Sequence, residues 1–158
     1  MENESNNIYK APESELEVSL EPEGGANNFK RFSAWGVFGL TVITIGIYPL
    51  YWLYTRSQIL NKFHRNKVSN NLLQTFVILV IISFSLQILS GVYAENMTIV
   101  LLNGVFNILY IVAYLMVLFK LSNRLTEVTG NKMNTVATFF FTAIYLQYKI
   151  NVAIDEGQ

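Results

Sequence analysis

The stretch LLQTFVILVIISFSLQILSGVY (residues 72–93) decides the fold class, because it is a nearly continuous apolar run without one charged side chain. An α-helix needs about 20 such residues to cross the roughly 30 Å hydrocarbon core of a bilayer. A second run of similar length, TIVLLNGVFNILYIVAYLMVLFKL, follows at residues 98–121. The two runs predict two transmembrane helices, and the short link between them, residues 94–97, predicts that they form an antiparallel hairpin.

Basic side chains surround this hairpin unevenly. The loop 55–71 and the loop 120–134 hold most of them, namely Arg56, Lys62, Arg65, Lys67, Lys120, Arg124 and Lys132. The link 94–97 holds no base and one acid, Glu95. Cytoplasmic loops carry an excess of Lys and Arg. We therefore expect loops 55–71 and 120–134 in the cytoplasm and the link 94–97 on the outer, periplasmic side.

The segments 32–54 and 135–148 are apolar and aromatic, but their type is open. Gly46 to Pro49 interrupts the first, because proline lacks a helical donor and restricts the residue before it. This predicts two arms, Phe32–Ile45 and Pro49–Phe63. Both segments have bases at both ends, which favours re-entrant or interfacial segments over full spans. Four full spans remain the alternative.

The chain ends are polar. Residues 1–28 contain seven of the eleven acids, and such a composition predicts a disordered cytoplasmic tail. With a polar end at 153–158, the helical membrane domain is expected at 29–152. The fold class is all-α: a multi-pass helical membrane protein with two firm transmembrane helices and two flanking aromatic-rich segments that are re-entrant, interfacial or spanning.

Polar residues inside the two runs form one stripe on each helix, at helical spacing. The stripes contain Ser83, Gln87 and Ser90 on one helix and Asn103, Asn107 and Tyr110 on the other. Small polar side chains hydrogen-bond between helices in membranes. We expect an interhelical polar network, and the alternative is a polar path for a solute.

Aromatic pairs recur beside bases in the flanking segments. The residues in question are Tyr51, Trp52, Tyr54 and Arg56 in the first, and Tyr145, Tyr148 and Lys149 in the last. Tyr and Trp favour the headgroup level of a bilayer, and a base beyond them reaches lipid phosphates. These residues are predicted interface anchors. An aliphatic–Asn step follows in both places, Leu60-Asn61 and Ile150-Asn151.

The motif GIYPLYWLY (residues 46–54) with the following Leu60-Asn61, and the closing YLQYKIN (residues 145–151), resemble the domain-of-unknown-function family numbered 4234. The resemblance covers roughly residues 32–152 and implies a small integral protein of the bacterial inner membrane. It implies no activity. Pro49 departs from the residue that many members have after the tyrosine.

The N-terminal tail contains the motif Asn7-Ile8-Tyr9-Lys10-Ala11-Pro12. It is similar to the N-P-Y-x-A-P tails of several bacterial membrane families. One aromatic residue and one proline in a polar segment suit docking into a partner's groove. Tyr9 and Pro12 are therefore the predicted partner motif, with an indifferent solvated tail as the alternative.

The sequence lacks the groups of ionisable or nucleophilic side chains that most enzymes and coupled transporters use. It has no cysteine, one histidine (His64) and one aspartate (Asp155), and no acid in the apolar runs. We identify no catalytic, metal or cofactor residues, and no soluble basic face for nucleic acid.

The expected function is a non-enzymatic interaction or scaffold protein, with the lipid bilayer and a protein partner of the tail as its contacts. The alternative is an oligomeric channel or small-solute transporter lined by Asn103, Asn107 and Gln87. Homo-oligomerisation is left open.

Overall fold

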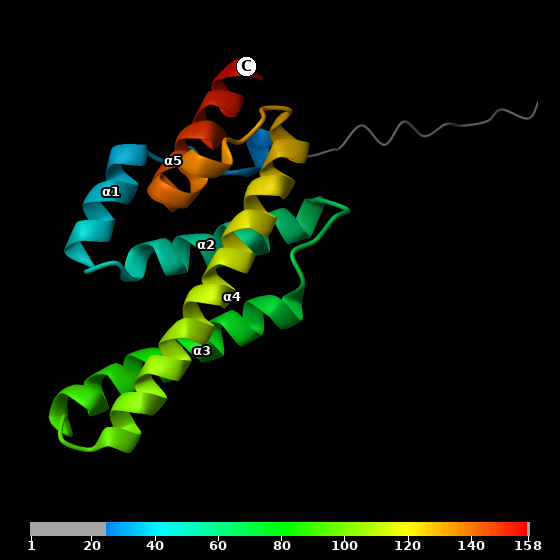
Figure 1. Cartoon of the computed structure of the whole chain (residues 1–158). Coiled ribbons are helices and arrows are strands. Elements are labelled where there is room, and N and C mark those ends of the chain that lie inside the picture. The colour runs from blue at the N-terminus through cyan, green and yellow to red at the C-terminus, as the bar shows by residue number, and fades with distance from the viewer. Residues whose placement is uncertain (1–24, 158) are drawn as a thin grey trace, which may run out of the picture.

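The computed structural model describes residues 25–157, and this part of the chain consists of helices without strands. In chain order the helices are η1 (Ala26–Asn28), α1 (Ala34–Ile43), α2 (Ile47–Phe63), α3 (Asn70–Val92), α4 (Met97–Thr129) and α5 (Thr135–Glu156). Figure 1 shows α3 and α4 as a long hairpin, with the remaining helices gathered at the end away from its tip. We call η1, α1, α2 and α5 the head.

The hairpin forms from the two apolar runs, as expected. Both α3 and α4 are long and apolar enough to cross a membrane by length and composition. The turn between them is fixed by Asn96, whose side chain accepts hydrogen bonds from the backbone N–H groups of Thr98 and Ile99. This is N-capping, which satisfies donors that have no partner inside the helix. Large side chains cover the outside of the hairpin and are exposed, for example Ile81, Ile88 and Val105.

Helix α4 continues well past its apolar run. Its 33 residues correspond to about 50 Å of helix, more than a bilayer core requires. It ends at Gly130, whose φ of 68° lies in the left-handed region that glycine adopts without strain. The last turns hold the buried residues Leu121 and Leu125, and the head packs around them.

The first aromatic segment breaks earlier than expected. Backbone φ is 51° at Ile45 and 85° at Gly46, so the chain turns before Pro49 rather than at it. Pro49 lies inside the first turn of α2, where a missing N–H costs nothing because that group has no helical partner. Helix α1 has 10 residues, about 15 Å, which is too short to span a bilayer.

Helix α5 is kinked at Thr142, whose φ of 41° and ψ of −120° are not helical. Such a conformation is strained for a β-branched residue. The kink separates two unlike halves. Phe140 and Phe141, before it, are exposed, whereas Leu146 and Ile150, after it, are fully buried.

Both ends of the folded unit extend further than the sequence suggested. Ala26 is buried in η1 although residues 1–28 were expected to be tail. At the other end α5 runs to Glu156, and Ala153 and Ile154 are buried although 153–158 was expected to be polar and free. In both places small apolar side chains join the same core, which orders the backbone around them.

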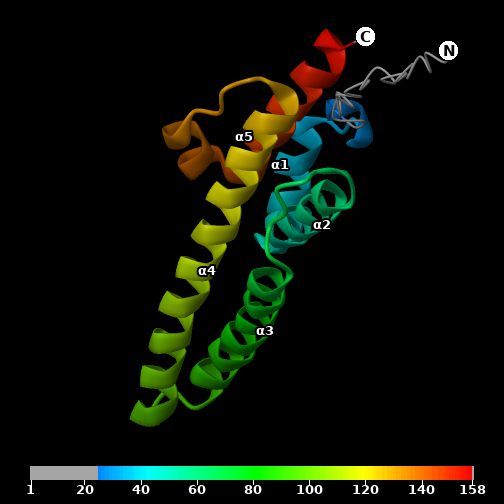
Figure 2. The same ribbon diagram turned by 90° about the vertical axis from the view of Figure 1, so that its right-hand side faces the viewer.

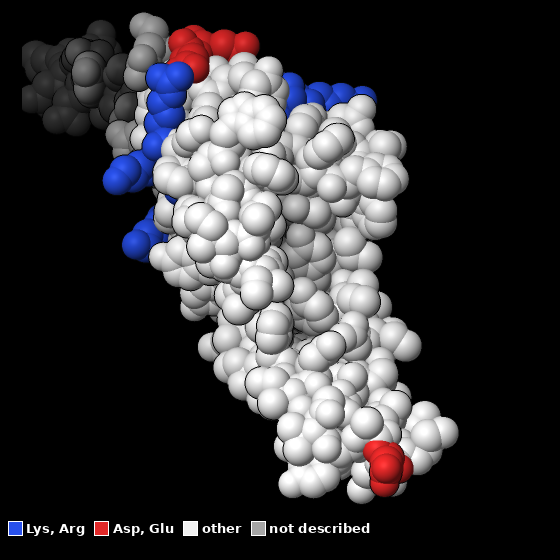
Figure 3. All heavy atoms as spheres, turned by 90° about the vertical axis from the view of Figure 1, so that its left-hand side faces the viewer, with Lys and Arg blue, Asp and Glu red and all other residues white. Residues whose placement is uncertain are grey.

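The head sits at one end of the hairpin, and α2 lies across the hairpin's long axis (Figures 1 and 2). Helix α5 packs on α1 and α4, and α2 packs on α4. Figure 3 shows Lys and Arg side chains together with a cluster of Asp and Glu at the head end, then a long uncharged surface, and a second acidic patch at the opposite end of the molecule. On this face the basic side chains therefore lie at the head end only.

Candidate functional site

A buried polar cluster in the head brings together the two sequence motifs. Gln147, from the closing motif on α5, is fully buried. Its Oε1 accepts a hydrogen bond from Trp52 Nε1 at 2.9 Å and another from an Arg56 terminal nitrogen at 3.1 Å. Trp52 and Arg56 belong to α2 and follow the GIY sequence of the first motif. Gln147 thus connects α5 to two residues of α2 that lie more than 90 positions earlier in the chain.

Arg56 is the unusual member of this cluster, because it is a buried cation held by neutral oxygens. Only 9% of it is exposed, and its guanidinium lies 5.8 Å from the centre of the Trp52 ring, a cation–π distance. It also donates to the Lys30 carbonyl at 3.3 Å. Burial lowers the pKa of Arg56 from its ordinary value, although an arginine stays protonated in proteins.

Asn151 extends the cluster to the start of the folded chain. Its Oδ1 accepts from Gln147 Nε2 at 2.9 Å. Its Nδ2 donates to the Phe32 carbonyl at 2.7 Å, and the Phe32 N–H donates back to Oδ1 at 3.4 Å. One asparagine side chain therefore holds both the N–H and the carbonyl of Phe32, which fixes the segment that leads into α1.

Asn61, near the C-terminal end of α2, holds another passing segment in the same way. Its Nδ2 donates to the Val68 carbonyl and its Oδ1 accepts from the Val68 N–H, each at 2.8 Å. We call Asn61 and Asn151 the two asparagine clamps. The preceding residues, Leu60 and Ile150, are both fully buried. The aliphatic–Asn steps thus share one structural role: the aliphatic residue enters the core and the amide holds a passing segment.

A second set of contacts surrounds Glu127, in the last turns of α4 beyond the apolar run. His64 Nε2 lies 2.9 Å from a Glu127 carboxylate oxygen, and Asn66 Nδ2 donates to the same oxygen at 3.0 Å. Arg124 pairs with the other oxygen. Hydrogen bonds from Asn66 first, then His64 and Arg124, lower the pKa of Glu127 from 4.5 to about 2. The loop 64–69 is thereby attached to α4 as well as to Asn61.

The predicted interface anchors fall into two groups. Tyr51 and Tyr148 are more than half exposed, Tyr54 is exposed and Lys149 is half-buried, and Tyr145 accepts a hydrogen bond from the Asn134 N–H. Trp52 and Arg56 were placed wrongly by the anchor interpretation. They face α5 inside the head, because Gln147 offers their polar atoms a partner that the sequence pattern does not reveal.

The predicted polar stripes do not join into one network in the single chain. Ser83 Oγ donates across the hairpin to the Phe106 carbonyl at 3.0 Å. Ser90 bonds instead to the Gln87 carbonyl of its own helix, and Gln87 is exposed. Asn103 Oδ1 is buried without a hydrogen-bond partner in the described chain. Asn107 is half-buried, and the Tyr110 ring lies 6.3 Å from the Tyr114 ring of the same helix, tilted by 46°.

The residues that matter most here were not selected from the sequence. Gln147, Asn151 and Asn61 were quoted as motif letters, but not as candidate site residues. The available signal was a pair of amides four positions apart, Gln147 and Asn151, on the same helix face as the apolar residues Ala143 and Ile154. Buried amides need partners, so their positions pointed to an internal hydrogen-bond cluster. The predicted partner motif, Tyr9 and Pro12, lies outside the described residues.

The geometry defines a class: an all-helical protein with two membrane-compatible helices and a small head closed by a buried amide–guanidinium cluster. No group of three metal-ligating side chains occurs among residues 25–157. The chain belongs to the family described as domain of unknown function (DUF4234), whose sequence model matches residues 32–156. The match starts at Phe32, beside the Asn151 clamp, and ends with α5. No curated protein and no solved structure matches the chain.

Proposed function

We propose that this chain is a non-enzymatic, multi-pass interaction or scaffold protein of the bacterial inner membrane. In this proposal the α3–α4 hairpin crosses the bilayer, with the link 94–97 in the periplasm. The head lies at the cytoplasmic headgroup level, with loops 55–71 and 120–134 on the cytoplasmic side.

The observation that carries the proposal is the polarity of the surface along the hairpin. Between the basic loops, α3 and α4 expose isoleucine, leucine and valine side chains on most of their outer surface. A soluble monomer rarely exposes a continuous apolar patch larger than a few hundred Å². The bases lie at the head end and Glu95 lies at the tip, which is the charge asymmetry of a chain inserted with its basic loops inside.

The head has the surface of a structure partly immersed in lipid. Trp35 is 80% exposed at the start of α1, and Phe140 is 71% exposed just before the α5 kink. These apolar side chains lie in segments that begin and end near bases, as interfacial helices do. Helices α1 and α2 and the first half of α5 therefore enter the headgroup region without crossing it.

A scaffold role is supported by how the polar atoms of the head are used. The amides of Gln147, Asn151 and Asn61 bond to the protein itself. The atoms that a catalyst would direct at a substrate are here used to hold helices and loops in place. A rigid head with exposed basic loops suits binding of a partner or a lipid surface.

The test is a topology measurement that exploits the absence of cysteine. Ser69→Cys and Asn96→Cys place single thiols in the 64–69 loop and in the link. An impermeant thiol reagent should label the Asn96 variant in intact cells and the Ser69 variant only after permeabilisation. The reverse labelling, or recovery of the protein in the soluble fraction, contradicts the proposal.

The second candidate function is an oligomeric channel or small-solute transporter. The unpaired buried oxygen of Asn103 favours it, because a neighbouring copy or a solute would supply the missing donor. Ion or solute flux in liposomes that is abolished by Asn103→Leu would establish this function in place of the scaffold role. The matched control is Asn123→Leu, at an exposed position on the same helix.

A partner of the N-terminal tail is tested separately. Crosslinking and pull-down of the intact chain are compared with a version lacking residues 1–24, which leaves η1 intact, and with a Tyr9→Ala, Pro12→Ala variant. Loss of the same partner in both variants supports the tail as the recognition element. Equal recovery of partners shows that the tail only separates or solubilises.

A further inference from the structure

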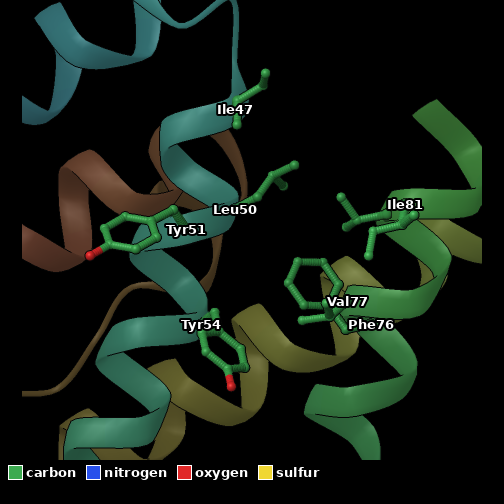
Figure 4. Close-up of a pocket in the computed structure, with 8 residues that line it drawn as sticks. Ile47, Leu50, Tyr51, Tyr54, Phe76, Val77 and Ile81 are labelled. Carbon is green, nitrogen blue, oxygen red and sulfur yellow. The ribbon is translucent and has the colours of Figure 1, made fainter. Parts of the chain in front are cut away.

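An apolar groove lies between α2 and α3, where the head meets the hairpin. It has a volume of about 360 Å³ and is lined from α2 by Ile47, Leu50, Tyr51 and Tyr54 and from α3 by Phe76, Val77, Val80 and Ile81. Figure 4 shows Leu50 on α2 facing Ile81 and Phe76 on α3 across this space, with Ile47 at one end and Tyr54 towards the other. Helix α2 packs on α4 and α5, which leaves this side of α2 open.

The groove continues toward the basic loop. A second hollow of about 250 Å³ shares Tyr54 and Val77 with the first and adds Gln74 and Ile78. Because α2 and α3 run in opposite directions, the end at Ile47 and Ile81 is the part farthest from the 64–69 loop. Gln74 lies one turn from the start of α3 and is exposed.

The loop that leads into α3, on the Gln74 side of the groove, carries two exposed bases. Arg65 and Lys67 are exposed in the loop that leads into α3, and the Asn61 clamp on Val68 holds that loop in position. Helix α3 has no side-chain cap at Ser69 and no acid in its first turn. Its first N–H groups therefore keep the partial positive charge of a helix start. The apolar walls thus lead to Gln74, one turn from the start of α3, and the chain before that start carries Arg65 and Lys67; Glu127 is engaged by His64 and Asn66 of the same loop.

We propose that this groove holds one acyl chain of an anionic phospholipid, with the lipid phosphate beside Lys67, Arg65 and the start of α3. The proposal rests on the membrane location proposed above. The lining fits the chain, since an acyl chain keeps apolar surroundings between these walls, whereas a polar ligand would find almost no partner there. The two bases explain the anion, since Lys and Arg near a membrane attract anionic lipids.

The size of the groove argues against a helix as the occupant. A helix with its side chains is about 10–12 Å across, and the two connected hollows are too small to contain even two turns of it. A lipid chain is narrow, flexible and already present at this depth beside α3. The groove opens among side chains that face outward, including the half-exposed Ile47, Tyr51 and Ile81, so a lipid can enter it sideways.

The experiment measures lipids retained by the full chain in native mass spectrometry, after addition of phosphatidylglycerol or phosphatidylcholine in detergent. The wild type should retain phosphatidylglycerol in preference to phosphatidylcholine. Val77→Trp fills the groove and should remove most of this retention. The matched control is Val105→Trp, an exposed valine on the outer face of α4, which should leave retention unchanged.

Two exposed variants test the two bases without changing the core. Lys67→Gln and Arg65→Gln should each lower phosphatidylglycerol retention about five-fold and leave phosphatidylcholine retention alone. Unchanged phosphatidylglycerol retention in Val77→Trp, with the variant still monomeric and folded, overturns the groove. Equal binding of both lipids in the wild type overturns the assignment of an anionic lipid. A wild-type dimer that Val77→Trp dissociates assigns the groove to a second copy.

These outcomes are independent of the topology test. A protein absent from membranes defeats the proposed function before any lipid is added. A membrane protein with the expected thiol labelling, but without groove-dependent lipid retention, leaves that function standing and removes only the lipid site.

Discussion

In the head, side-chain amides connect helices that are far apart in sequence, whereas the hairpin has one side-chain hydrogen bond between α3 and α4 in the described structure, from Ser83 to the Phe106 carbonyl. The head buries polar atoms, and the hairpin exposes apolar ones. In a bilayer, apolar side chains gain nothing by leaving lipid for another helix, so packing and occasional hydrogen bonds hold spanning helices together. At the headgroup level water competes, and a folded head needs specific partners.

This difference teaches where substitutions will matter. In the proposed membrane orientation, hairpin residues on the outer face would be interchangeable among apolar types, because lipid would accept them equally. The head depends on individual atoms, since a buried amide or guanidinium that loses its partner pays the full cost of desolvation. The four predictions below test this contrast, from the largest expected effect to the smallest.

Gln147→Leu should destabilise the head by about 3 kcal/mol, because it removes the acceptor of both Trp52 and the charged Arg56, and bonds to charged groups count for more than neutral ones. The measurement is denaturant unfolding in detergent, followed by Trp52 fluorescence in a Trp35→Phe background. The matched control is Gln87→Leu in the hairpin, at an exposed position, which should change stability by less than about 0.5 kcal/mol.

The same experiment has an internal rescue. Adding Arg56→Met to Gln147→Leu should recover part of the lost stability, because the unpartnered buried charge disappears together with its acceptor. Equal destabilisation by Gln147→Leu and Gln87→Leu would mean that the buried cluster contributes no more than a lipid-facing side chain, and the contrast between the regions would fail.

Asn61→Leu and Asn151→Leu should each cost about 2 kcal/mol, since each asparagine satisfies a backbone N–H and a carbonyl. The two clamps share no partner, so their effects should add. Hydrogen exchange reports them separately, at the Val68 amide for Asn61 and at the Phe32 amide for Asn151. Asn123→Leu, at an exposed position on α4, is the control and should leave the protection of both amides from exchange unchanged.

Ser83→Ala should cost about 1 kcal/mol, the ordinary net value of one hydrogen bond, because it removes the bond from α3 to the Phe106 carbonyl. Ser90→Ala should have no measurable effect on hairpin association, since Ser90 bonds within its own helix. Thermal unfolding of the two variants in the same detergent gives the comparison. A larger loss for Ser90 would place the interhelical contact near the tip instead.

The smallest effect should come from acid titration of Glu127. Its pKa is depressed from 4.5 to about 2, so its contacts stabilise the fold fully above pH 4.5 and lose this contribution as pH falls toward 2. The carboxylate is exposed, and the effect is therefore modest. Protection factors of the loop 64–69 amides, which correct the exchange rates for their intrinsic pH dependence, should fall in that window, and Glu127→Gln should abolish this fall. An identical fall in Glu127→Gln would assign it to another group.

The hairpin was predictable from sequence because its evidence is local: run length, absence of charge and a short link together require two adjacent helices. The head was not, because its decisive contacts join distant residues. Trp52 beside Tyr51 and Tyr54 has the pattern of an interface belt, and nothing local shows that Gln147 lies opposite its ring nitrogen. The interruption was expected over Gly46 to Pro49, but the turn is made at the start of that stretch, by the left-handed pair Ile45 and Gly46.

The overhang of α4 makes it a lever. In the proposed orientation, about 20 Å of its roughly 50 Å lies beyond a 30 Å bilayer core. Glu127 and the buried Leu121 and Leu125 lie on this part. A change of 10° in the tilt of the spanning part would carry the far end about 3 Å sideways. In the proposed membrane orientation, a change in membrane thickness would thereby displace the 64–69 loop, which Glu127 ties to α4 and Asn61 ties to α2.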